Sequence, residues 1–142
     1  MSVKLQTQKM RRLAVLSQKN LGYIYDDTNG DGGRPAGEKK EWLNTGKAFL
    51  RTLAKDLGLS EFKVDANPGG IAVNGESTLI GMWPDGRGVY VHFCQVLGGV
   101  GPVLYRTVSH MKDYGGGHNQ WINSWELSRS SYEDFVERIK NV

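Results

Sequence analysis

The stretch STLIGMWPDGRGVYVHFCQV, residues 77–96, decides the fold class of the chain. Two runs rich in β-branched and aromatic residues, 77–83 and 88–96, flank the sequence Pro84-Asp85-Gly86. Such runs are typical of strands, and Pro, Asp and Gly are the residues that tight turns favour. The stretch therefore predicts two neighbouring antiparallel strands joined by a short turn.

The same composition recurs on both sides of this pair. The further strand-like runs are EFKVD (61–65), GIAVN (70–74), PVLYRTVSHM (102–111) and NQWINSWEL (119–127). Turn sequences separate the runs, and Asn74-Gly75 is a strong signal for a two-residue hairpin. No spacer is long enough for the crossover helix that a parallel pair of strands needs. We therefore predict an antiparallel β-meander of four to six strands.

Three segments carry apolar residues at helical spacing. The first includes Met10 and Leu13 and is expected to stop near Gly22, and the third opens with the capping-box sequence Ser130-Ser131-Tyr132-Glu133. The second is the clearest, beginning at Lys39 and ending before Gly58. Its apolar stripe consists of Trp42, Leu43, Phe49, Leu50, Leu53 and Leu57.

Gly46 lies on the same stripe. A glycine inside a helix costs about 1 kcal/mol relative to alanine, so we expect a close-packed neighbour at this position. The whole chain, 1–142, is predicted to be a single α+β domain with two or three helices packed on one face of the sheet. Residues 1–8 are expected to be a flexible basic terminus, and residues 26–38 a polar, mobile loop. The predicted core contains Trp42, Phe49, Leu53, Phe93 and Phe135.

Composition and charge restrict the function classes. Of the 142 residues, 39% are hydrophobic and 23% charged, and the single cysteine, Cys94, excludes an intramolecular disulfide. No stretch has the length of a signal peptide or a membrane span, so we expect a cytoplasmic protein that makes no membrane contact. The net charge of +3 favours an anionic partner.

The positive charge is concentrated near the N-terminus. Residues 1–20 contain no acidic residue, and their cations are Lys4, Lys9, Arg11, Arg12 and Lys19. On a helix these side chains can contact phosphates without reading base sequence, although the usual role of such a run is a solvated helix face. The acid-free run favours nucleic acid, or an acidic protein surface, as the partner.

A glycine-rich connection supplies a second candidate patch. The sequence Lys112-Asp113-Tyr114-Gly115-Gly116-Gly117-His118 joins two predicted strands. Consecutive glycines can turn backbone N–H groups inward to hold an anion. Lys112 and the preceding Arg106 could add charge, and Tyr114 a stacking face. The alternative is an ordinary hairpin connection that contains glycine.

The sequence DDTNGDGGRPAGE, residues 26–38, matches the calcium-loop pattern of an EF-hand at its fixed positions. Asp27, Asn29, Asp31 and Glu38 would be the ligands. Arg34 and Pro35 stand where such loops carry other residue types, and no second copy is present. Asn, Gly and Asp are also the residues of any exposed turn, so a polar connection without calcium is the alternative.

Residue spacing offers one arrangement for nucleophilic catalysis. His92 and Cys94 lie two residues apart on a predicted strand and therefore share a face, as do Arg106 and His110. A cysteine in a strand is usually a small buried hydrophobe, and no nucleophile elbow or zinc-ligand spacing accompanies the pair. We therefore expect no enzymatic activity.

Three segments together resemble a family. WLNTGKAFLRTLAKDLGL, NPGGIAVNGESTLIGMW and LYRTVSHMKDYGGGHNQW are similar to small proteins encoded by bacteriophages and related mobile elements. The resemblance covers about residues 40–125 and rests on an NPxGIAVxGE hairpin and a DYxGGxN loop. It implies a bacterial host cell as the setting, and nucleic-acid handling or the blocking of a host protein as the role. No activity or site residue is attached to the pattern.

These observations lead to one principal expectation and two alternatives. The principal expectation is a non-enzymatic accessory protein that binds nucleic acid through its basic N-terminal helix and its glycine-rich loop. One alternative is an effector that inhibits or recruits a host or phage enzyme by protein–protein contact. The other is a protein that binds a small phosphorylated ligand at the glycine-rich loop.

Overall fold

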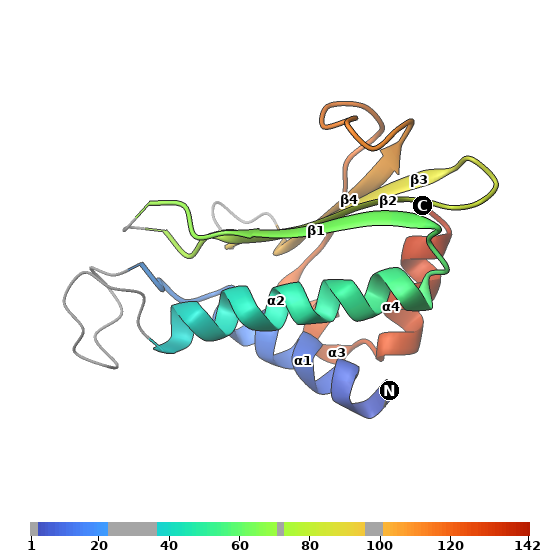
Figure 1. Cartoon of the computed structure of the whole chain (residues 1–142). Helices are drawn as coiled ribbons and strands as arrows, with labels where there is room; N and C mark the ends of the chain where they lie inside the picture. Colours follow the sequence, from blue (N-terminus) through green and yellow to red (C-terminus); the bar gives the residue numbers. More distant parts are fainter. Residues whose placement is uncertain (1–2, 23–36, 71–72, 96–100) are drawn as a thin grey trace.

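The computed structural model describes residues 3–22, 37–70, 73–95 and 101–142, and within them the chain forms four helices and one five-stranded sheet (Figure 1). The strands are β1 (Glu61–Asn67), β2 (Glu76–Met82), β3 (Gly88–Phe93), β4 (Val103–Val108) and β5 (Gln120–Ile122). They follow one another in sequence order across the sheet, and every neighbouring pair is antiparallel. The predicted antiparallel meander is confirmed.

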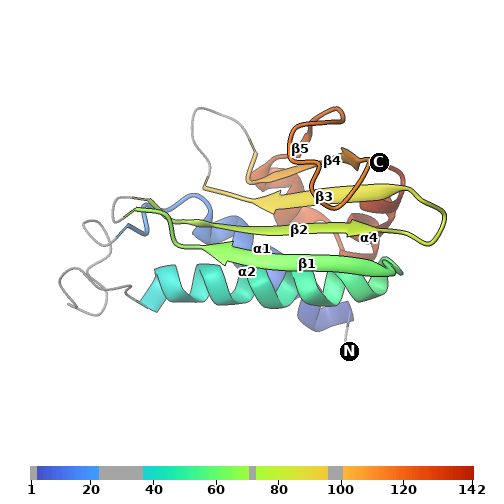
Figure 2. The ribbon, with the colours of Figure 1, turned by 45° about the horizontal axis from the view of Figure 1, so that its top comes forward.

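The helices all pack on one face of this sheet (Figure 1). They are α1 (Val3–Leu16), α2 (Gly37–Asp56), α3 (Ser124–Arg129) and α4 (Tyr132–Lys140). The α+β class is therefore confirmed, with the short helix α3 added to the two or three that were predicted. None of the four described helices covers the opposite face, which Figure 2 turns toward the viewer. We call it the open face.

The core lies between the helices and the sheet and is centred on Phe49 of α2. Its ring makes edge-to-face contacts with Phe93, Tyr132 and Phe135, at centroid distances of 5.5, 5.7 and 5.5 Å. The five residues predicted for the core are all at most 2% exposed. Burial of these aromatic side chains holds α2, α4 and β3 together.

The sequence predicted one strand over residues 119–127, and this prediction is wrong. The strand ends at Ile122, and Asn123 caps helix α3. The Asn123 side chain accepts a hydrogen bond from the Glu126 backbone N–H at 2.8 Å, and the Glu126 side chain accepts one from the Asn123 N–H. This reciprocal capping box overrides the strand tendency of the aromatic residues. At α4 the cap is Ser131, which bonds the N–H of Asp134.

Asn74 does not form the tight hairpin turn that Asn74-Gly75 indicated. Its side chain is fully buried and joins the end of α1 to the β1–β2 connection. Asn74 Oδ1 accepts from the Leu21 N–H at 2.7 Å, and Nδ2 donates to the carbonyls of Lys19 at 2.9 Å and Leu16 at 3.3 Å. These bonds fix the segment that follows α1 against the β1–β2 connection. Helix α1 ends at Leu16, and the predicted end near Gly22 is wrong.

Two side chains at the start of α2 form hydrogen bonds to the β1–β2 connection. Lys39 is fully buried and donates to the carbonyls of Val73 at 2.8 Å and Gly70 at 3.1 Å, and its burial lowers its pKa. Trp42 Nε1 donates to the Gly75 carbonyl at 3.0 Å. The described residues of the predicted strand 70–74 form this bound connection and no strand.

Two expectations about mobile segments have different outcomes. Residues 3–8, expected to be a flexible terminus, are the first turns of α1 and include the fully buried Gln6. Of the predicted polar loop 26–38, residues 26–36 lie outside the described residues, and Gly37 and Glu38 open α2.

The expected close neighbour of Gly46 is Ser77 of β2. A Cβ atom at Gly46 would lie 2.5 Å from Ser77 Oγ and 3.0 Å from Ser77 Cβ. We expect Gly46→Ala to destabilise the fold by about 1–2 kcal/mol, because overpacking costs more than the gain in helix propensity. Urea unfolding followed by tryptophan fluorescence measures this effect.

Ser77→Ala provides the matched control. Ser77 Oγ is buried and has no hydrogen-bond partner among the described residues, so its removal alone should be neutral or slightly stabilising. In the double variant it should recover most of the stability that Gly46→Ala loses. Equal losses in the single and double variants would show that this contact does not explain the glycine.

Candidate nucleic-acid interface

Helix α2 places residues of different character on three of its sides. The side toward the sheet is apolar and includes Trp42, Phe49 and Leu53. A second side faces helix α1, and the third faces away from the rest of the molecule. The distribution of charge between the second and third sides defines the candidate site.

The acidic residues of α2 are all engaged by other helices or by the chain that follows α1. Glu41 accepts from Arg12 Nε at 2.6 Å and Nη2 at 2.8 Å, and Glu38 accepts from Lys19 Nζ at 2.7 Å and from Arg12 at 3.3 Å. The bond from Arg12 lowers the pKa of Glu41, and the same bond raises the pKa of Arg12. Asp56 accepts from the Tyr132 hydroxyl at 2.6 Å.

The outward side of α2 carries only positive charge. Lys40, Lys47, Arg51 and Lys55, which we call the basic stripe, are spaced by seven, four and four residues and therefore lie on one side of the helix. Lys40, Arg51 and Lys55 are exposed and Lys47 is half-buried. Among the described residues, none of the four forms an ion pair.

The basic stripe has the length of a short nucleic-acid contact. At 1.5 Å per residue, the distance from Lys40 to Lys55 is about 22 Å along the helix axis. This corresponds to about six nucleotide steps of one strand of a duplex. Asn44, which lies on the same side of α2 as the basic stripe, is exposed and adds a neutral hydrogen-bonding group.

The predicted cations of the N-terminal region divide into two groups. Lys4 and Arg11 are exposed, seven residues apart on the outward side of α1, which lies beside α2 (Figure 1). They have no ion-pair partner among the residues that the structure describes, and nor does the half-buried Lys9. Arg12 and Lys19 instead neutralise the carboxylates of α2.

Arg106 is turned into the protein and does not project toward solvent. It is 4% exposed and stacks over the ring of Tyr90, with 4.8 Å between the guanidinium carbon and the ring centroid. Its guanidinium donates to the carbonyls of Gly116 at 2.6 Å and Asp113 at 3.1 Å. Arg106 therefore ties the glycine-rich loop to the open face.

The N–H groups of the glycine-rich loop already surround an anion, the carboxylate of Asp113. It accepts from the Gly116 N–H at 2.8 Å and from the N–H and hydroxyl of Ser109 at 2.9 and 3.0 Å. These bonds, with the Ser109 N–H first among them, lower the pKa of Asp113 to about 2. The Gly115 N–H makes a smaller contribution to the same lowering, the Lys112 N–H donates to His110 Nδ1 at 3.2 Å, and Tyr114 is 61% exposed.

The candidate nucleophile Cys94 lies at the end of β3, next to a paired histidine. His92 Nε2 lies 2.7 Å from Glu76 Oε2, so this histidine is oriented by the carboxylate. Burial, with a smaller effect of Glu76, raises the pKa of the Cys94 thiol from 9.0 to about 11. A thiol with a raised pKa is a poor nucleophile at neutral pH.

Cys94 should therefore alkylate slowly. At pH 8, iodoacetamide is expected to modify it about tenfold more slowly than a free cysteine peptide, because a smaller thiolate fraction outweighs the higher nucleophilicity. Mass spectrometry over time measures the rate, and the urea-unfolded chain is the control, in which the thiol should react at the peptide's rate. Equal rates in the folded chain and the peptide would contradict the burial of this thiol.

Most of the predicted calcium site cannot be placed. Asp27, Asn29 and Asp31 lie outside the described residues. The fourth ligand, Glu38, is engaged by Lys19 and Arg12, as described above. Calcium binding at 26–38 stays a prediction.

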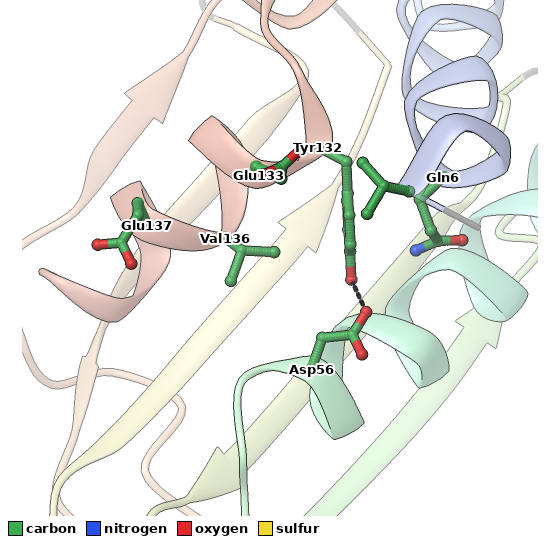
Figure 3. A pocket seen from close by; sticks show the side chains of 7 residues that line it. Gln6, Asp56, Tyr132, Glu133, Val136 and Glu137 are labelled. Atoms are coloured by element: carbon green, nitrogen blue, oxygen red, sulfur yellow. Dashed lines mark hydrogen bonds between the residues drawn. The ribbon is translucent and has the colours of Figure 1, made fainter. Parts of the chain in front are cut away.

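A pocket of about 370 Å³ lies where α1, α2 and α4 meet (Figure 3). Its walls are the side chains of Val3, Gln6, Asp56, Tyr132, Glu133, Val136 and Glu137. Tyr132 donates to Asp56 across the pocket, and burial together with this bond raises the pKa of its hydroxyl. Three carboxylates line the pocket, so it repels anions and does not belong to the basic surface.

The chain matches no protein-family model, no curated protein and no solved structure. The resemblance to phage-encoded proteins therefore stays a prediction. Within the described part of the chain, no helix combines the length and apolar character needed to cross a bilayer.

Proposed function

We propose that this chain binds the phosphate backbone of nucleic acid through the basic stripe of α2, with Lys4 and Arg11 of the neighbouring helix α1 as further contacts. One observation supports this proposal most strongly. All three acidic residues of α2 are engaged by other segments, while its four outward cations have no ion-pair partner among the described residues. The outward side of α2 is therefore more basic than the net charge of +3 suggests.

The proposed mechanism is charge neutralisation. Each lysine or arginine that contacts a phosphate releases a condensed counterion from the nucleic acid, and this release is the main source of affinity. Long, flexible lysine side chains on a helix surface fix no base pattern, so the binding does not depend on base sequence. The protein itself supplies no catalytic group in this role.

The surface differs from the one that the sequence predicted. The N-terminal helix keeps two exposed cations, but Arg106 and Gly116 serve the internal bonding of the glycine-rich loop. The same bonding removes the main support for a small phosphorylated ligand at this loop. The basic stripe takes the place of the second patch.

Fluorescence anisotropy with labelled single- and double-stranded oligonucleotides tests the proposal. We expect binding at about 50 mM salt, similar affinities for oligonucleotides of different sequence, and marked weakening at about 200 mM salt. The protein must first be freed of co-purifying nucleic acid with nuclease and high salt. No binding to any DNA or RNA at low salt would overturn the proposal.

Two exposed tryptophans support a second candidate function, the effector that binds another protein. Trp125 of α3 is 65% exposed and carries Arg129 over its ring at 4.6 Å, and Trp121 of β5 is 38% exposed. Tryptophan and arginine are the residues most often found at the energetic centres of protein interfaces. Under this alternative, Trp125→Ala abolishes a stoichiometric complex isolated from bacterial cells and leaves nucleic-acid binding unchanged.

A further inference from the structure

Strand β1 forms one edge of the sheet (Figure 2). Its seven residues pair with β2 on one side, and no described strand lies on the other. Five of the seven residues are exposed and the other two, Val64 and Ala66, are half-buried. An edge strand of this length offers unpaired N–H and C=O groups to a further strand.

The sequence of β1 is EFKVDAN. Two copies of it are complementary in charge when they pair antiparallel with the centre of the pair at Val64. In that register Val64 lies opposite Val64 of a second copy. Lys63 then lies opposite Asp65, and Asp65 opposite Lys63, so two cross-strand ion pairs form. Opposite charges at directly facing positions stabilise an antiparallel pair, and like charges destabilise it.

The two adjacent registers lack this match, and a pair centred on Phe62, which also places Glu61 opposite Lys63, overlaps only residues 61–63 of each strand. Centring the pair on Lys63 places Lys63 opposite its own copy and Glu61 opposite Asp65, and centring it on Asp65 places two aspartates together. A register centred between two residues joins positions that point to opposite faces of the sheet. Residues that face each other across an antiparallel pair point to the same face, so such a register forms no regular ladder.

The apolar residues of β1 support the same register. Phe62 is 36% exposed on the helix-facing side of the edge, and in the Val64-centred pair it lies opposite Ala66. Within one strand, Lys63 Nζ lies 3.5 Å from Asp65 Oδ2, and the two side chains are 62% and 60% exposed. In a pair of strands these four charges alternate in sign.

We infer that two copies of this chain associate through antiparallel pairing of their β1 strands, centred on Val64. The twofold axis is perpendicular to the sheet, so the two five-stranded sheets become one and all helices lie on the same side. This includes the two α2 helices with their basic stripes. Strand β1 contains no residue of the basic stripe, but α2 packs against β1, so the pairing also brings the two basic stripes closer together.

Analytical ultracentrifugation of nuclease-treated protein tests this inference. The intact chain should change from a monomer of 15.8 kDa to a dimer as its concentration rises. The range from about 5 to about 200 µM is suitable, because interfaces of modest size dissociate within it. A monomer at all these concentrations would overturn the inference.

Charge exchange at two exposed positions tests the register. Lys63→Asp and Asp65→Lys should each abolish the dimer, because like charges then face each other. The double exchange K63D/D65K should restore it. An equimolar mixture of the two single variants should form a heterodimer, since the acidic positions of one copy face the lysines of the other.

The outcomes are unambiguous because both residues are exposed and circular dichroism verifies folding. Single variants that dimerise as well as the intact chain, or a double exchange that stays monomeric, would contradict the Val64-centred pair. Failure here leaves the proposed function untouched, because no residue of the basic stripe is changed. A variant lacking the basic stripe should still dimerise.

Discussion

Replacing Lys40, Lys47, Arg51 and Lys55 together by glutamine is expected to weaken binding to nucleic acid by about 100-fold or more at about 100 mM salt. The four side chains supply most of the proposed phosphate contacts. Glutamine keeps good helix propensity, and none of the four has an ion-pair partner among the described residues, so the fold should be little affected. Fluorescence anisotropy measures the affinity, and thermal unfolding verifies stability.

A second set of four substitutions controls for net charge. Arg87, Lys112, Arg129 and Lys140 are exposed and lie outside α1 and α2. Replacing all four by glutamine removes the same total charge but should lower affinity by less than about tenfold, through long-range attraction alone. Equal losses in the two variants would contradict the leading role of the basic stripe, because overall charge or Lys112 would then contribute as much to binding. Because Lys112 is included, the control also tests the glycine-rich loop.

Asn74→Ala is expected to lower the free energy of unfolding by about 3 kcal/mol, because it removes the partner of the buried Leu21 N–H and one bond from each of two backbone carbonyls. The N–H of Leu21 and the carbonyls of Lys19 and Leu16 would all lose their bonds to the side chain. The loss should be accompanied by fraying of the end of α1, which hydrogen exchange of the amides after Leu16 would detect. Urea unfolding measures the change in stability.

Asn67→Ala is the matched control for this substitution. Asn67 is an exposed asparagine in the same region, and its side chain accepts a single bond from the Gly69 N–H at 2.9 Å. Its replacement should cost less than about 1 kcal/mol. If the two asparagines prove equally important, Asn74 is not the anchor of the α1 end.

The sheet could be predicted because its signals are local. Strands β2 and β3 have dense runs of β-branched and aromatic residues. The residues Pro84-Asp85-Gly86 between them are typical of a tight turn, which joins two antiparallel strands. The apolar stripe of α2 and the packing role of Gly46 were also visible in the sequence. These features depend on residue order over a few positions.

The remaining features depend on contacts between distant segments. Asn74 has the local signature of a hairpin turn, but its partners lie more than 50 positions away at the end of α1. Arg106 and Gly116 were expected at an anion site, and they bond instead within the loop, to each other and to Asp113. Residue types alone do not determine which hydrogen-bond donor of the folded chain pairs with which acceptor.

The basic stripe could have been found from the sequence. Lys40, Lys47, Arg51 and Lys55 recur at helical spacing within the helix that was predicted best. Their significance, however, depends on the acidic residues of the same helix. Only the structure shows that Glu38 and Glu41 are neutralised by Arg12 and Lys19, which leaves the opposite charge on the outward side.

The dependence of affinity on salt, compared between the intact chain and the variant without the basic stripe, tests the central claim most directly. With six contacting cations, a plot of log K against log salt for a duplex should have a slope of about −5. Removal of the basic stripe should reduce the magnitude of that slope by about 3 to 4, because four fewer counterions are released. An unchanged slope would contradict the claim, since it would place the phosphate contacts elsewhere on the molecule.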